Sequence, residues 1–451
     1  MRFILASVMA LLLTAGPALA HASGRGFVML LPTGYVIWGG ALAVLVSFAA
    51  VSLLPSRGVH VTRKEEVDGI WIYVTSLVSA AVIGFVLWAG LRGPNDPAEN
   101  ILPLAVWTLW WVVIVMLHPV IGNLWAGLNP FTGLHALLRG SRPPPLNYPA
   151  AFGFWPAVLI FLAFAWFQLV YPKPEDRDML ALALSLYLGV TMLMVLLFGP
   201  AKWLGKADPF AVFLRQLGAV APVARTGLRW PGAGLLSLPA LPVSGVLFVL
   251  LTLSSITFDG FANTFTWLSF AGINPLDYPG RTAMMGANTA GLLAAFAVLA
   301  LGFYASVALG WRWAGRSGDF NSLAGRLVYS LIPISIAYHF AHYLSDTLVN
   351  LQYLALVLND PLQNGSDLMG LGHMHVTASF QNTASGALML FSAQTGAIVL
   401  GHVVGVAVAH AMLADRDLPK ARLLKLELPL ALCMVAYTGF GLWLLAAPSI
   451  A

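Results

Sequence analysis

Apolar residues along this chain gather in long uninterrupted runs. Ten such runs are about 20 residues long, which is enough for a helix to cross roughly 30 Å of hydrocarbon. No stretch shows the alternation of apolar and polar residues that marks a half-buried strand. The pattern predicts an all-α protein, a polytopic membrane bundle of about ten transmembrane helices. The predicted spans are residues 34–54, 70–91, 102–121, 153–171, 179–200, 237–258, 283–310, 325–357, 391–413 and 426–447.

Composition narrows the class of protein further. Of 451 residues, 59% are hydrophobic and only 9% are charged, with a mean hydropathy of +0.82. A soluble domain carries about 25% charged residues, so a soluble enzyme is excluded, as is a disordered or fibrous chain. The single cysteine, Cys433, excludes a disulfide framework and any multi-cysteine metal or iron–sulfur site within this chain.

The first 20 residues have the three parts of a secretory signal. Arg2 is the basic start, residues 3–15 form the apolar core, and Ala18-Leu19-Ala20 is a small-residue cleavage site. The alternative is an uncleaved first helix, but the core is short and Gly16-Pro17 interrupts it. We therefore expect a signal peptide over residues 1–20 and one transmembrane domain over residues 21–451. Cleavage would expose His21, whose free amine and ring nitrogen together suit copper(II), although any residue could follow a cleavage site by chance.

Basic residues orient the predicted spans. Cytoplasmic loops of membrane proteins carry an excess of Lys and Arg, and a periplasmic mature N-terminus places 17 of the 23 basic residues in cytoplasmic loops and five outside. This distribution predicts a multi-pass protein of the bacterial inner membrane. It also explains the net charge of +5 without a nucleic-acid partner. The 17 residues are Arg57, Arg63, Lys64, Arg139, Arg142, Lys202, Lys206, Arg215, Arg225, Arg229, Arg312, Arg316, Arg326, Arg416, Lys420, Arg422 and Lys425.

Two of the cytoplasmic loops resemble each other. Leu124-Trp125 precedes Asn129-Pro130-Phe131, and Trp203-Leu204 precedes Asp208-Pro209-Phe210, each with an amphipathic stretch after it. The loops are interpreted as interfacial helices of a weak internal repeat. The alternative is that Trp, Pro and Phe are simply common at a membrane surface.

Ionisable residues inside spans are costly and often mark function. The eighth predicted span contains His339, His342 and Asp346, at helical spacings that place all three on one face. The ninth contains His402 and His410 on nearly one face. Counting inward from the span ends places His342 and His402 near the middle of the bilayer and His410 near the cytoplasmic side.

Further candidates lie toward the periplasmic side. His373 and His375 form a His-x-His motif in a loop, and Asp259 stands at the outer end of the sixth span. Imidazole and carboxylate groups in a low-dielectric bundle are compensated well by a divalent metal ion, here copper or zinc, which could also generate a hydroxide nucleophile. The alternative is that each histidine only bonds a neighbouring carbonyl or hydroxyl.

Several short motifs resemble a bacterial family of multi-span proteins described as fenitrothion hydrolase-like. The motifs extend from the mature N-terminus to the ninth span. They are His21-Ala22-Ser23, Arg25-Gly26-Phe27-Val28, Leu31-Pro32-Thr33-Gly34, Phe258-Asp259-Gly260-Phe261, Tyr338-His339-Phe340-Ala341-His342-Tyr343, His373-Met374-His375-Val376 and Gly401-His402-Val403-Val404 through Ala409-His410. The resemblance implies an inner-membrane hydrolase that releases a nitrophenol and a dialkyl thiophosphate from organophosphorus triesters, as one subunit of a two-subunit complex acting on a lipophilic substrate.

Three functions remain open at this stage. In a metal-dependent hydrolase, the metal ligands would be His339, His342 and His402, with Asp346 or Asp259 as the base or an orienting residue. In a copper-handling protein, the ion would be captured outside by His21, His373 and His375. It would then be passed inward by His339, His342 and His402, along a polar path that continues beyond His410. In a redox subunit, haem b would lie between His339 or His342 and one of His402 and His410.

Overall fold

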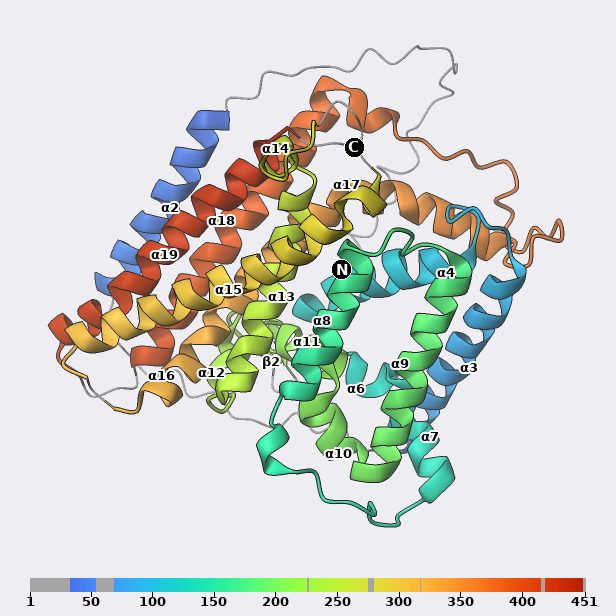
Figure 1. The fold of residues 1–451 in the computed structure, drawn as a ribbon, viewed down its shortest axis with the longest axis horizontal. Coiled ribbons are helices and arrows are strands. Elements are labelled where there is room, and N and C mark those ends of the chain that lie inside the picture. Colours follow the sequence, from blue (N-terminus) through green and yellow to red (C-terminus); the bar gives the residue numbers. More distant parts are fainter. Residues whose placement is uncertain are drawn as a thin grey trace.

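The computed structural model describes residues 33–53, 69–224, 227–274, 280–316, 318–414 and 418–448. The fold is an all-α polytopic helical bundle, 78% helical. Nine of the described helices are long and apolar enough to span a membrane (Figure 1). They are α2 (Thr33–Leu53), α3 (Ile70–Arg92), α4–η1–α5 (Ile101–Pro103, Leu104–Ile114, Val115–Ile121), α9 (Arg177–Phe198), α13 (Val243–Ala262), α15 (Arg281–Trp313), α16–η5–α17 (Phe320–Leu327, Val328–Leu331, Ile332–Asn359), α18 (Ala384–Ala414) and α19 (Lys420–Ala446).

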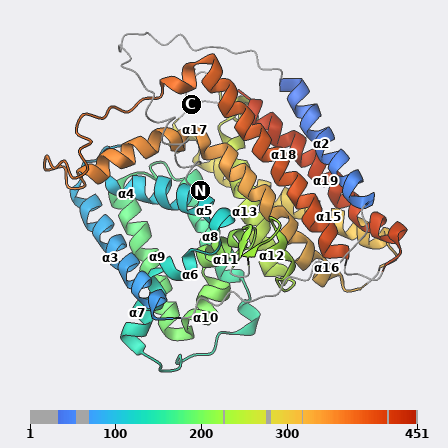
Figure 2. The same ribbon diagram turned by 180° about the vertical axis from the view of Figure 1, so that it is seen from behind.

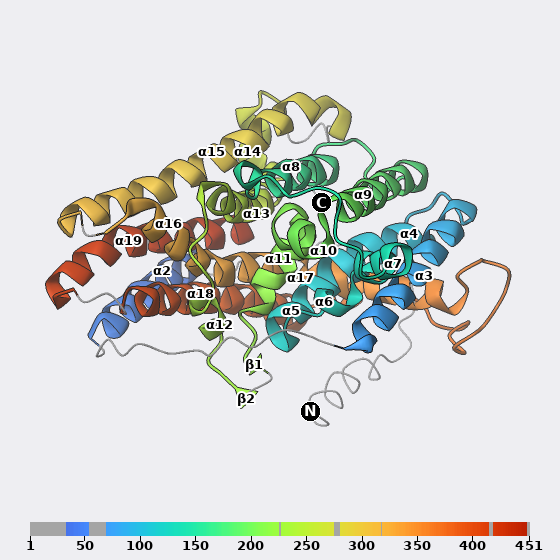
Figure 3. The ribbon, with the colours of Figure 1, turned by 90° about the horizontal axis from the view of Figure 1, so that it is seen from below.

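Shorter elements connect these spans. A small antiparallel hairpin pairs Val223 with Leu228 and projects from the bundle in Figure 3, next to α12. The elements are α6 (Trp125–Leu128), α7 (Pro130–Arg139), η2 (Ala150–Phe152), α8 (Trp155–Leu169), α10 (Pro200–Lys202), η3 (Trp203–Ala207), α11 (Pro209–Gly218), β1 (Val223–Ala224), β2 (Gly227–Leu228), α12 (Ala233–Leu236), α14 (Phe265–Phe270) and η6 (Ser379–Asn382). The predicted signal peptide, and His21 with it, lies outside the described residues.

Every predicted span overlaps a helix. Helices α18 and α19 begin seven and six residues before the predicted starts at 391 and 426, and two other spans differ in ways that affect the fold. The fourth, predicted at 153–171, is α8, whose 15 residues rise only about 22 Å, which is short of a full crossing. The sixth was predicted at 237–258, and this start is wrong because α13 begins at Val243. Pro239 and Pro242 lack an amide hydrogen and disfavour helix in the residue before them, so the helix starts after Pro242 and runs on to Ala262. Asp259 is consequently inside the last turn of α13.

The two similar loops fold in the same way. Each loop follows a glycine with positive φ, Gly122 at 115° and Gly199 at 80°. A short turn that begins at or just before a buried tryptophan comes next. The chain then continues into a ten-residue helix that starts with proline, which is α7 in the first loop and α11 in the second. Asn129 caps α7 and Asp208 caps α11, each by accepting backbone N–H bonds in the first turn. We call α7 and α11 the paired half-helices. Their common construction supports the interpretation as a repeat.

Helix α13 forms the centre of the bundle, and α17 packs closely on α18 beside it (Figures 1 and 2). Gly401 and Gly405 of α18 form a small-xxx-small pair, the spacing that lets two membrane helices approach closely. A Cβ at Gly401 would meet the Cβ of Ala337 at 2.4 Å, and one at Gly405 would meet the carbonyl oxygen of Ser330 at 2.7 Å. These contacts fix the register of α18 on α17.

Candidate functional site

The densest polar cluster joins the last turn of α13 to the middle of α17. The Nε2 atom of His342 lies 3.0 Å from Oδ2 of Asp259, and the Tyr343 hydroxyl donates to the same carboxylate oxygen at 2.7 Å. The side chains of His342 and Asp259 are 29% and 16% exposed. Because a carboxylate only accepts, Nε2 of His342 carries a hydrogen and, in the neutral ring, Nδ1 is the free acceptor.

Tyr343 connects this pair to two more helices. Its hydroxyl accepts bonds from Nε2 of Gln168 on α8, at 2.6 Å, and from the indole N–H of Trp111 on η1, at 3.3 Å. The Arg281 guanidinium at the start of α15 in turn donates to the backbone oxygen of Gln168 at 2.9 Å. The Tyr343 oxygen thus makes three hydrogen bonds. It fixes the relative positions of α8, α13, α17 and η1 around the Asp259–His342 pair.

His339 belongs to the same side of α17 but has a different partner. Its Nε2 atom donates to the backbone oxygen of Trp111 at 2.9 Å, and its ring lies edge-on to the rings of Trp111 and Tyr343. This carbonyl belongs to η1, an 11-residue π-helical stretch. Such wide turns are uncommon and frequently occur at functional sites. A cavity of about 10 Å³ beside His339, Tyr343 and Asp259 is large enough for about one water.

His402 lies apart from this cluster. The α17–α18 register places Gln394 next to Ala341, whose oxygen it bonds at 2.8 Å, and Gly401 next to Ala337. Along α18, His402 is eight residues, or about 12 Å, from Gln394 and therefore from the level of Ala341. The sequence predicted one depth for His342 and His402, and the packing of α17 on α18 does not match this prediction. The Nδ1 atom of His402 bonds the Ile398 oxygen, and its Nε2 atom is buried without a partner among the described residues.

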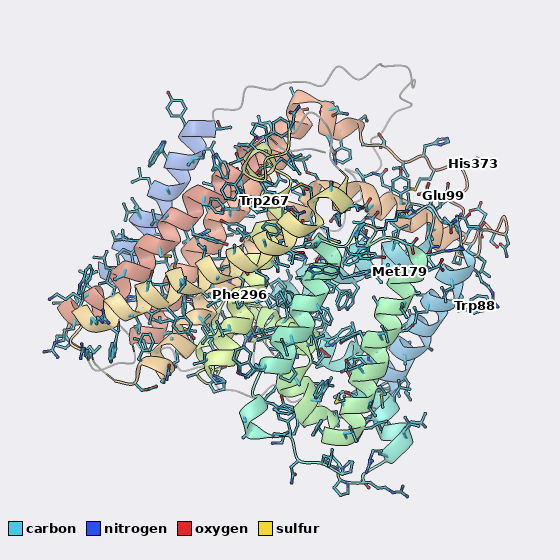
Figure 4. The ribbon with its side chains drawn as sticks, in the orientation of Figure 1. Trp88, Glu99, Met179, Trp267, Phe296 and His373 are labelled. Carbon is cyan, nitrogen blue, oxygen red and sulfur yellow. The ribbon has the colours of Figure 1, made fainter. Side chains whose placement is uncertain are left out.

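The remaining candidates are also dispersed. Asp346 is exposed one turn beyond His342, and His373 and His375 are exposed on the loop between α17 and α18, where Figure 4 shows His373 at the edge of the molecule. In the part of the chain that the structure describes, no group of three or more His, Cys, Asp or Glu side chains is arranged to hold a metal ion. The described residues therefore do not bring the predicted metal ligands together.

A second buried pair escaped the sequence analysis. Nδ1 of His410 lies 2.9 Å from Oε1 of Glu427 on α19, and both side chains are nearly buried, at 11% and 5% exposed. Glu427 could have been recognised as an acidic residue inside the tenth predicted span. Tyr343 and Gln168 gave no comparable signal, because uncharged polar residues are frequent in membrane helices. His118 has a structural role, since its two ring nitrogens bond the Ile114 oxygen and the Trp125 backbone N–H.

Comparisons with protein-family models, with curated proteins and with solved structures found no match for this chain.

Proposed function

We propose that this protein is a membrane-bound hydrolase of lipophilic organophosphorus triesters in which His342 is the general base. The observation that carries the proposal is the Asp259–His342 pair, in which one ring nitrogen is held by a carboxylate and the other is left for a substrate water. A Cβ placed on Gly260 would lie 3.8 Å from Nδ1 of His342, so the glycine keeps the space beside this nitrogen open. The resemblance to fenitrothion hydrolase-like proteins supplies the substrate class.

The proposed reaction uses this geometry. As the oxygen of a water bonds to phosphorus, His342 Nδ1 takes its proton, and the bond between phosphorus and the aryl oxygen breaks, its electron pair leaving with the nitrophenolate. The imidazolium then gives its proton to the nitrophenolate, so that the products are the nitrophenol and the dialkyl thiophosphate and His342 is neutral again. Asp259 acts as a positioning residue: it holds the neutral ring with its hydrogen on Nε2 and stabilises the imidazolium that forms. Asp259 or Asp346 was expected from the sequence to be the base, whereas the geometry of the Asp259–His342 pair favours His342.

No step is assigned to a metal ion, because the described histidines do not converge on one point. His339 uses Nε2 for a backbone oxygen and His342 uses Nε2 for Asp259. The predicted copper or zinc ion stays a prediction, checked by elemental mass spectrometry on the full chain. The cavities beside His339 and His410 are about 10 Å³ each, so haem b is not part of this proposal.

The test is hydrolysis of fenitrothion by the purified full-length chain, followed by the absorbance of the released nitrophenol. We expect His342→Gln to lower the rate by about 10²- to 10⁴-fold, the usual contribution of general base catalysis, and Asp259→Asn to lower it less. His135→Gln, at a histidine on α7, is the matched control and should keep the wild-type rate. Equal rates for His342→Gln and His135→Gln would contradict the proposal.

Two finer points belong to the same proposal. The protein would reside in the bacterial inner membrane with a periplasmic N-terminus, which the distribution of basic residues supports, and it would work with a second membrane subunit, as the resemblance implies. Reporter fusions at residues 140 and 365, in the loops after α7 and α17, would report opposite sides of the membrane. Both reporters on one side would contradict this orientation.

A second candidate, passage of a copper ion, is favoured by one observation. His402 and His410 lie on one side of α18, eight residues apart, and the Nε2 atom of each is buried without a partner among the described residues. Unpartnered imidazole nitrogens along a membrane helix suit a relay of a cation. Copper uptake into vesicles that contain the protein should fall in His402→Gln and His410→Gln while hydrolysis persists. Uptake that is unchanged in both variants would remove this candidate.

A further inference from the structure

A large cavity reaches the starts of the two paired half-helices, α7 and α11, and is separate from the small cavity beside the Asp259–His342 pair. Its volume is about 590 Å³, within the range of roughly 300–1,000 Å³ that is usual for small-molecule pockets. Its walls come from α3, η1, α8 and α9, and its end is closed by α6 and by the starts of α7 and α11. In membrane transporters built from repeats, the substrate lies between the repeats. This place in the fold identifies the cavity as a candidate ligand site.

The lining of this repeat cavity is apolar and unusually aromatic. None of the residues lining it carries a charge, and Ser79 is its only hydroxyl besides Tyr187, whose own hydroxyl donates to Asp208 at 2.8 Å. A charged ligand would lose its hydration without compensation here. Aromatic pairs add attraction beyond the area they bury, so the lining favours a neutral ligand with an aromatic ring over a plain hydrocarbon chain. The aromatic lining residues are Trp107, Trp110, Trp125, Phe131, Phe164, Phe167, Tyr187 and Phe210.

Trp125 lies at the closed end of the cavity. The backbone N–H of Trp125 bonds Nε2 of His118 at 3.1 Å, and Nδ1 of His118 bonds the Ile114 oxygen, which fixes the position of the tryptophan backbone. Its indole nitrogen is buried and closed off from the cavity. At this end Trp125 therefore offers a ligand aromatic surface and no hydrogen-bond donor.

The route into the cavity runs through the lipid-facing surface. Val78, Val82 and Leu109, which line the cavity, are 57%, 54% and 36% exposed. They belong to spanning helices α3 and η1, so a cavity that opens beside them opens at the depth of the bilayer hydrocarbon. A molecule dissolved in the membrane could therefore reach the cavity without crossing water.

From these observations we infer that the repeat cavity binds a neutral aromatic molecule taken from the bilayer, held by contact with the aromatic residues that line it. The inference does not depend on the proposed hydrolase. A ring-bearing triester would meet its requirements, and so would other neutral aryl compounds.

Benzophenone tests the inference directly, because it is neutral, has two rings and one carbonyl oxygen, and crosslinks to nearby C–H bonds under light. The full-length protein in lipid nanodiscs would be irradiated with benzophenone and the crosslinked residues mapped by peptide mass spectrometry. We expect crosslinks to concentrate on α3, η1, α8 and α9 and to be displaced by excess diphenyl ether in the wild-type protein. Crosslinks spread evenly over the lipid-facing helices, or displaced equally by hexadecane, would overturn the inference; the second outcome would indicate a site for lipid chains.

Variants make the assignment specific. Ala163→Phe adds a ring inside the cavity and should abolish the mapped crosslinks, whereas Ala297→Phe, at an exposed alanine of α15, is the matched control and should preserve them. Crosslinking that is unchanged in Ala163→Phe would contradict the site.

Discussion

Tyr343→Phe tests whether the polar cluster between α8, η1, α13 and α17 holds these helices together. The substitution removes one oxygen and leaves the ring, so the aromatic contact with His339 is kept. The lost oxygen donates to Asp259 and accepts from Gln168 and Trp111. Each buried group left without a partner costs about 1–3 kcal/mol, and small rearrangements or a water would recover part of this. We expect the free energy of unfolding to fall by roughly 2–5 kcal/mol.

Tyr304 offers a control with the same chemical change. Its hydroxyl is also buried but has no hydrogen-bond partner among the described residues, so Tyr304→Phe removes an unsatisfied group and should leave stability unchanged or slightly higher. Thermal melting of both detergent-purified variants, followed by tryptophan fluorescence, measures the contrast. A melting temperature for Tyr343→Phe equal to that of Tyr304→Phe would refute the hydrogen-bond cluster as described.

Two further predictions concern the half-helices and the α17–α18 contact. Burial raises the pKa of Asp208 to about 6, from a usual value of 3.8. The folded state therefore binds the proton more tightly than the unfolded chain. As the pH rises from about 4 to 6, the free energy of unfolding should fall by up to roughly 3 kcal/mol, and the melting temperature should fall with it. Asp208→Asn, which places at position 208 the residue type of Asn129, should remove this dependence, and equal pH profiles for the variant and the wild-type protein would contradict the prediction. Gly401→Leu should destabilise the protein by about 1–3 kcal/mol through overpacking against Ala337. Gly396→Ala, with open space around its Cβ position, should be close to neutral in the same melting assay. Equal losses of stability in the two variants would contradict the close contact between Gly401 and Ala337.

Much of the fold could be predicted because its physical cause is local. A run of about 20 apolar residues must be helical to satisfy its backbone in a bilayer, and the paired half-helices were visible as Asn129-Pro130 and Asp208-Pro209, where cap and proline are adjacent. The start of α13 was misplaced because hydrophobicity continues through Pro239 and Pro242, which stop a helix without reducing the apolar run.

The candidate site could be predicted only in part. Asp259 and His342 were both recognised as polar residues in apolar spans, but their pairing depends on how α13 packs against α17, which spacing within either helix does not encode. The same limit explains why His402 was expected at the depth of His342: the two lie in neighbouring spans, and the close contact at Gly401 fixes their relative depth. Tyr343 and Gln168 act through contacts between distant segments, so neither stood out from the sequence.

In the proposed reaction, His342 is held by Asp259 and removes a proton from the attacking water. The most direct measurement is the rate of nitrophenol release from fenitrothion in H₂O and in D₂O, for the wild-type protein and for His342→Gln with its folding verified by melting. A proton transferred in the rate-determining step makes the wild-type reaction slower in D₂O. We predict this slowing for the wild-type protein, and for His342→Gln a much lower rate that is nearly the same in both solvents. A variant that retains the wild-type rate and the wild-type difference between the two solvents would contradict the account.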